Sequence, residues 1–117
     1  MKSTIVYIET SKKTYPLVFN LNVMEEIQEK YGSIDKWGEL TQGNGEPKIK
    51  ELKTGIMFML NEAIDMENEN NGTNEPMLTE KQVGRIMGEV GIDVIVKKIQ
   101  EITIASTRIE DNTGKNE

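Results

Sequence analysis

Two short runs of residues near the N-terminus are rich in β-branched and aromatic side chains. They cover residues 4–8 and 14–19, and the polar segment 10–13 lies between them. Because such runs favour strands and such segments favour turns, the pattern predicts an antiparallel hairpin. Pro16 has no N–H to donate, so we expect its strand to be at an edge of the sheet or irregular at that point. A hairpin alone is only marginally stable, so we expect one face to pack on helices.

A helical spacing of apolar residues follows the hairpin. We expect a first helix that Asn22 caps, with Glu25 completing a variant of the capping box and Gly32 ending the helix. Ser33 is then expected to start a short second helix, and the glycine-containing segment 41–47 is expected to be a loop. The apolar positions of the first helix are Val23, Met24, Ile27 and Tyr31.

The longest predicted helix covers residues 48–67 and begins beside Pro47, a residue that suits the first turn of a helix. Within it, residues 56–60 are all apolar. A single apolar stripe cannot account for such a turn, so it must be covered on more than one side. The cover could be the core, another copy of the chain or a client protein. We therefore predict that part of this segment is exposed in a monomer or is covered by another copy.

The second half of the chain begins with a polar stretch over residues 67–76. We predict that this stretch is mobile, has no anchor and is dispensable for folding. Thr79 is the expected cap of the next helix, because Gln82 stands where it can close a capping box. Three glycines weaken that helix. Asp93 is expected to begin the last helix, whose inward positions are Ile92, Ile95, Val96, Ile99 and Ile102.

These elements together predict the α+β class, with an N-terminal antiparallel β-hairpin packed on a mostly α-helical bundle of four to five helices. A length of 117 residues allows one domain. We assign that domain to residues 1–108. Residues 109–117 are polar and are expected to form a disordered C-terminal tail.

Cysteine and histidine are both absent. Their absence excludes disulfides, thiol nucleophiles, zinc-finger ligand sets, Ser-His-Asp triads and histidine-based proton transfer. We therefore expect a protein that is not an enzyme and has no cofactor. The two acidic clusters do not change this expectation. Asp65, Glu67 and Glu69 lack the spacing of a calcium loop, and Glu25 with its neighbours Glu26 and Glu29 reads as a solvated helix face.

The net charge of −6 arises in one part of the chain, because residues 61–80 contain six acidic and no basic side chains. We see no basic patch, and we expect no nucleic-acid partner. No apolar run approaches the roughly 20 residues that a membrane span needs. The first twenty residues do not resemble a signal peptide, so an intracellular protein without membrane contact is expected.

Methionines on the long helix are the candidate contact residues. Methionine fills irregular cores, and it also forms adaptable surfaces that bind varied apolar helices. The all-round apolar turn gives weight to the second interpretation. The predicted protein-binding residues are Ile56, Met57, Phe58, Met59 and Met66.

Three segments, taken in order, resemble one known family. They are TYPLVFNLNVMEEIQEKYGS (14–33), LNEAI (60–64) and LTEKQVGR (78–85), with the Asn/Glu-rich break between the last two. In this order they are similar to the tail assembly chaperones of siphophages and prophages of Gram-positive bacteria. The resemblance covers most of residues 4–105 and includes no active-site motif.

The resemblance implies a non-enzymatic factor that binds the tape measure protein in the host cytoplasm and helps tail tube protein assemble around it. Such a factor is absent from the mature virion, and it could form a homo-oligomer. A client helix would place its apolar side against residues 57–59. The competing interpretation is a small structural or connector protein of the virion, from the neck or from tail completion. Finding the chain in purified particles would distinguish the two.

Overall fold

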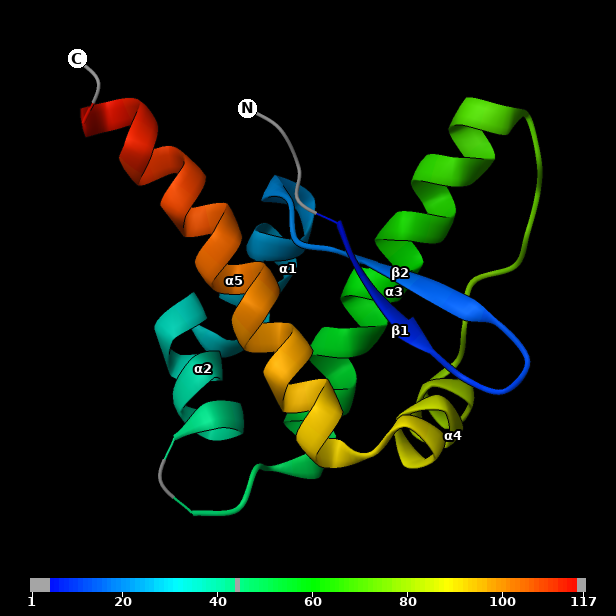
Figure 1. Cartoon of the computed structure of the whole chain (residues 1–117), viewed down its shortest axis with the longest axis horizontal. Helices are drawn as coiled ribbons and strands as arrows, with labels where there is room; N and C mark the ends of the chain where they lie inside the picture. Colours follow the sequence, from blue (N-terminus) through cyan, green and yellow to red (C-terminus); the bar gives the residue numbers. More distant parts are fainter. Residues whose placement is uncertain (1–4, 44, 116–117) are drawn as a thin grey trace.

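The computed structural model describes residues 5–43 and 45–115, with side chains described to residue 105. Its described part forms an N-terminal hairpin packed against five helices, which confirms the predicted α+β class (Figure 1). The elements are β1 (Ile5–Glu9), β2 (Thr14–Val18), α1 (Leu21–Tyr31), α2 (Ile34–Gln42), α3 (Ile49–Asn71), α4 (Glu80–Val90) and α5 (Ile92–Lys115).

The hairpin tolerates Pro16 because of its register. The N–H of Thr10 donates to the carbonyl of Lys13 at 2.9 Å, so this closing pair is hydrogen-bonded. Hydrogen-bonded and non-hydrogen-bonded pairs alternate in an antiparallel ladder. Tyr7↔Pro16 lies three pairs further along and is therefore non-hydrogen-bonded. The missing N–H of Pro16 therefore removes no hydrogen bond between the two strands. Both strands of a two-stranded sheet are edge strands, so the strand with proline lies at an edge, as predicted.

The inner face of the hairpin rests on the helices. Val6, Ile8 and Leu17 are buried on this face, where β1 contacts α5. Helix α3 is the central helix of the fold, since β2, α1, α2 and α4 all pack against it. Figure 1 shows α3 passing behind the hairpin, with its C-terminal end projecting beyond it.

Trp37 from α2 closes the core against α3. The indole is fully buried, and its Nε1 donates to the carbonyl of Glu51 at 2.9 Å. A Cβ atom on Gly55 would overlap the indole ring. Glycine at this position is therefore what allows the tryptophan to approach the helix backbone so closely.

Two predicted helix starts differ from the structure, by two residues for α1 and by one residue for α3. Helix α1 is capped by Asn20, not Asn22, because the side chain of Asn20 accepts from the N–H of Val23 at 3.1 Å directly after β2. Helix α3 begins at Ile49 with Lys48 as its N-cap residue, and it continues to Asn71 instead of ending near residue 67. It ends where Gly72 adopts a left-handed conformation, with φ of 66°.

The predicted capping box at the start of α4 is confirmed. Thr79 accepts from the N–H of Gln82, whose side chain accepts from the N–H of Thr79. Helix α5 differs from the prediction at its end. Its backbone remains helical to Lys115, which includes residues 109–115 of the predicted disordered tail. No proline or glycine interrupts the sequence between Gly91 and Gly114, so no residue there stops the helix. Residues 116–117 lie outside the described residues.

Two asparagines of α3 hold the polar link between α3 and α4. The side chain of Asn61 bonds both backbone groups of Leu78, accepting from its N–H at 2.8 Å and donating to its carbonyl at 3.1 Å. Asn68, two turns later, makes the same two contacts with Glu75 at 2.9 and 3.0 Å. The predicted absence of an anchor is therefore wrong, because the asparagine amides take the place of backbone partners along the extended link.

Candidate protein-binding surface

The apolar turn of α3 belongs mainly to the core. Ile56 and Met59 are both 0% exposed, which corrects their predicted role as contact residues for a partner. Met57 and Phe58 are half-buried and pack against the same core. The turn is apolar all round because α3 is central and has neighbouring elements on several sides. Only part of the segment, Met57 and Phe58, retains exposure.

Met66 lies at a different place, beside the outer face of the hairpin. It is half-buried, and the side-chain amide of Asn20 approaches its sulfur at 3.8 Å. Together with the side of β1 and β2 opposite to Val6, Ile8 and Leu17, it borders a hollow of about 130 Å³, which we call the outer cleft. The outer cleft is lined by Ile5, Tyr7, Pro16, Val18, Ala63, Met66, Glu67 and Asn70.

Large apolar side chains are exposed around the outer cleft. Ile5 is 45% exposed and Tyr7 is 52% exposed, and both stand on the outer face of β1. A single exposed apolar residue is ordinary on a protein surface, whereas a group of them marks an interaction site more often. The outer cleft thus unites one predicted contact residue, Met66, with two that the sequence analysis did not select.

The rim of the outer cleft is acidic. Glu67 lines it, and Glu62 stands one turn before Met66, where its carboxylate accepts from the side-chain amides of Asn20 at 2.7 Å and Asn22 at 2.9 Å. The pKa of nearby Glu26 is raised, first by burial and then by the negative charge of Glu62. Added negative charge is therefore unfavourable at this end of the molecule, and a partner segment with basic residues beside its apolar ones would fit it.

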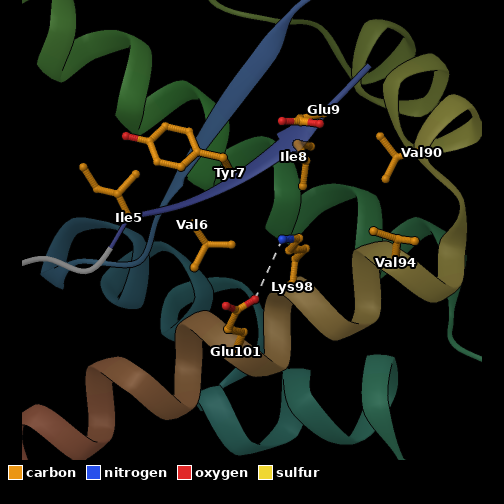
Figure 2. A pocket seen from close by; sticks show the side chains of 9 residues that line it. All are labelled: Ile5, Val6, Tyr7, Ile8, Glu9, Val90, Val94, Lys98 and Glu101. Carbon is orange, nitrogen blue, oxygen red and sulfur yellow. Dashed lines mark ion pairs between the residues drawn. The ribbon is translucent and has the colours of Figure 1, made fainter. Parts of the chain in front are cut away.

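A second and larger hollow follows the free edge of β1 (Figure 2). It measures about 650 Å³, and we call it the edge groove. One wall is β1 itself, and the other is formed by Val90 with the α5 residues Val94, Lys98 and Glu101. Figure 2 shows Lys98 and Glu101 below the middle of β1, on the side toward which Val6 and Ile8 point.

The hairpin turn is fixed at the α4 side of this groove. The N–H of Ser11 donates to Glu89 at 2.6 Å. This hydrogen bond lowers the pKa of the Glu89 carboxyl, and the charge of Lys12 acts in the same direction. The contact ties the tip of the hairpin to α4 and so sets the position of β1 over α5.

The two hollows offer apolar contact area and backbone hydrogen-bonding groups. Among the side chains that the structure describes, no three acidic residues are grouped so that they could hold a metal ion. In the same part of the chain, every buried side-chain nitrogen or oxygen has a hydrogen-bond partner. Within the acidic segment 61–80, Glu62 accepts from the side-chain amides of Asn20 and Asn22, and Glu67 lines the outer cleft.

No family model, curated protein or solved structure matches this chain at a significant level. Within residues 5–43 and 45–115, no helix combines the length and the apolar character that crossing a membrane requires.

Proposed function

We propose that this protein is a tail assembly chaperone of a siphophage or prophage of Gram-positive bacteria. It acts without catalysis in the host cytoplasm, binds the tape measure protein and assists assembly of the tail tube, and it is not part of the mature virion. The observation that supports a binding function is the group of exposed apolar side chains, Ile5, Tyr7 and Met66, around the outer cleft. The assignment to tail assembly rests on the resemblance of segments 14–33, 60–64 and 78–85.

A helix of the client is the partner that suits the outer cleft. The cleft lies between a sheet face and the projecting end of α3, so an amphipathic helix can bury its apolar side against Tyr7 and Met66. Glu62 and Glu67 then lie beside the helix, where they favour lysine or arginine on its flanks. Tape measure proteins are long and helical, and their apolar surface must be covered before the tail tube surrounds them.

The test is co-expression of the chain with the tape measure protein encoded by the same phage or prophage. We expect the two proteins to co-purify. Met66→Glu should reduce the recovered complex at least about tenfold, because it places a charge within the apolar contact beside an acidic rim. Far-ultraviolet circular dichroism should show unchanged helix content, since Met66 is only half-buried.

Met57→Glu is the matched control on the same helix. Met57 is also half-buried but does not line the outer cleft, so its complex should be recovered as in the wild type. If Met57→Glu weakened binding and Met66→Glu did not, the contact would instead lie at the apolar turn of α3, residues 56–60. The proposed function itself would be contradicted if the wild-type chain failed to bind the tape measure protein. It would also be contradicted if the chain were found in purified particles.

A further inference from the structure

The free edge of β1 presents backbone groups in a regular row. Hydrogen-bonded pairs of the hairpin include Thr10↔Lys13 and alternate from there, so the N–H and carbonyl groups of Ile5, Tyr7 and Glu9 point away from β2. No hydrogen bond from another described residue reaches these groups on the outer edge. The edge opens into the edge groove, and an additional strand could pair there.

This edge is complementary to a copy of itself. If β1 of a second chain lies antiparallel with Tyr7 opposite Tyr7, then Ile5 stands opposite Glu9 at both ends. All three pairs are then hydrogen-bonded, because each of these residues directs its backbone groups outward. Between them, Val6 stands opposite Ile8 of the second copy on the inner face, which extends the apolar layer above Val94.

The charges below the edge fit the same arrangement. A twofold axis through the paired Tyr7 residues and perpendicular to the sheet makes the two α5 helices antiparallel. Lys98 and Glu101 lie below the middle of β1, so Lys98 of one chain then faces Glu101 of the other. Within one chain these two form only a loose ion pair at 4.0 Å, with side chains 34% and 61% exposed, and both can reach a partner.

We propose that two copies of this chain associate through their β1 edges into a continuous four-stranded sheet, with α5 from each copy beneath it. The inference concerns the backbone edge of β1, whose residues Ile5 and Tyr7 also line the outer cleft, and it does not depend on the proposed function. The dimer places the two Tyr7 side chains next to each other on the outer face. It therefore joins the apolar surfaces of the two outer clefts into one.

The main test removes one outward N–H from β1. Tyr7→Pro eliminates the central inter-chain donor but no donor of the hairpin, for the same reason that Pro16 is tolerated opposite it. Sedimentation velocity over a dilution series should show a monomer–dimer equilibrium for the wild-type chain and a monomer for Tyr7→Pro. Thr14→Pro is the matched control, because it removes an outward N–H from the other edge of the hairpin, and it should dimerise as the wild type does.

A charge exchange on α5 tests the orientation of the two copies. Lys98→Glu places two carboxylates opposite each other at both symmetric contacts, and it should raise the dissociation constant of the dimer about tenfold. Combining it with Glu101→Lys restores opposite charges within and between chains and should return the constant to the wild-type value. A double variant that stays as weak as Lys98→Glu would overturn the antiparallel placement of α5.

Amide hydrogen exchange measured by nuclear magnetic resonance tests the pairing without substitution. As the concentration of the wild-type chain rises, exchange at Tyr7 and Glu9 should slow, whereas Val6 and Ile8 should remain unchanged because their N–H groups already bond β2. A wild-type chain that stays monomeric at every concentration would overturn the proposal. So would a dimer in which Tyr7 exchanges at the monomer rate, or slowing at Tyr7 only when a client is added.

Discussion

Helix α3 has neighbours on several sides, from β2, α1, α2 and α4, whereas β1 contacts β2 along one edge and α5 beneath one face. Both segments are apolar, and they differ in how their backbones are satisfied. A helix bonds its own backbone groups and can be surrounded completely by side chains. A strand depends on its neighbours for these bonds, so a two-stranded sheet keeps an open edge on each side. In this protein the apolar turn of α3 lies mainly in the core, whereas β1 buries Val6 and Ile8 on one face and leaves Ile5 and Tyr7 exposed on the other.

The sharpest test of this contrast compares two methionines of α3. Met59→Ala removes a fully buried side chain and should lower the free energy of unfolding by about 2–5 kcal/mol. Met66→Ala removes a half-buried side chain beside the outer cleft and should cost less than about 1 kcal/mol, since water already reaches it. Urea unfolding of both variants, followed by Trp37 fluorescence, measures the difference. Equal losses would show that the two positions are equally buried in solution.

A second substitution tests the closeness of α2 and α3. Gly55→Ala should lower the free energy of unfolding by about 1–3 kcal/mol, because the added methyl group overlaps the indole of Trp37. Gly88→Ala is the control, since a Cβ there meets nothing within 4 Å and alanine favours helix. We expect it to leave stability unchanged or raise it slightly. A neutral Gly55→Ala would mean that Trp37 has room to move.

The fold was largely predictable from local patterns. Runs of β-branched and aromatic residues, the spacing of apolar residues, helix caps and glycine positions located all seven elements, and the capping box at Thr79 was placed correctly. The errors lie where two signals compete within a few residues. Asn20 and Asn22 can both cap a helix, and only the position of β2 decides between them. The end of α3 was missed because its last turns are polar, although Gly72 marked it.

The candidate binding surface was much less predictable. An apolar run on a helix does not show whether its own chain or a partner covers it. Here Ile56 and Met59 are buried by residues of their own chain. Exposure of Ile5 and Tyr7 depends on where α3 and α5 lie beneath and beside the hairpin, which no local pattern encodes. The spacing of Asn61 and Asn68 did contain a usable signal, because residues seven apart lie on one face of a helix.

A smaller effect is expected in the link between α3 and α4, which has no regular secondary structure and is held by asparagine side chains of α3. Asn61→Ala removes both hydrogen bonds to the backbone of Leu78 and should lower the free energy of unfolding by about 1–2 kcal/mol. Amide exchange at Leu78 should become faster. Asn70→Ala, on an exposed position of the same helix, should change neither quantity. A neutral Asn61→Ala would mean that these two hydrogen bonds do not hold Leu78 in solution.

The smallest expected effect concerns the contact between α1 and α3, where the half-buried Tyr31 lies at the border of the core. Tyr31 is half-buried, and its hydroxyl donates to Glu51 at 2.7 Å. Burial, followed by this hydrogen bond, raises the pKa of Tyr31 from 10.0 to about 12. In the unfolded chain the phenol ionises near its ordinary value. The stabilisation from Tyr31 is therefore complete below pH 10 and is lost as the pH rises through its folded pKa.

Two measurements test the direction of this pH dependence. In the folded wild-type chain, the near-ultraviolet absorbance of ionised tyrosine should include one component that appears near pH 12, and Tyr31→Phe should remove that component only. The difference in thermal midpoint between the wild type and Tyr31→Phe should shrink between pH 10 and pH 12. Ionisation of Tyr31 near its ordinary pKa of 10.0 would mean that the Tyr31–Glu51 contact is open to water in solution. In that case, the contact between α1 and α3 would behave like the exposed hairpin and not like the core.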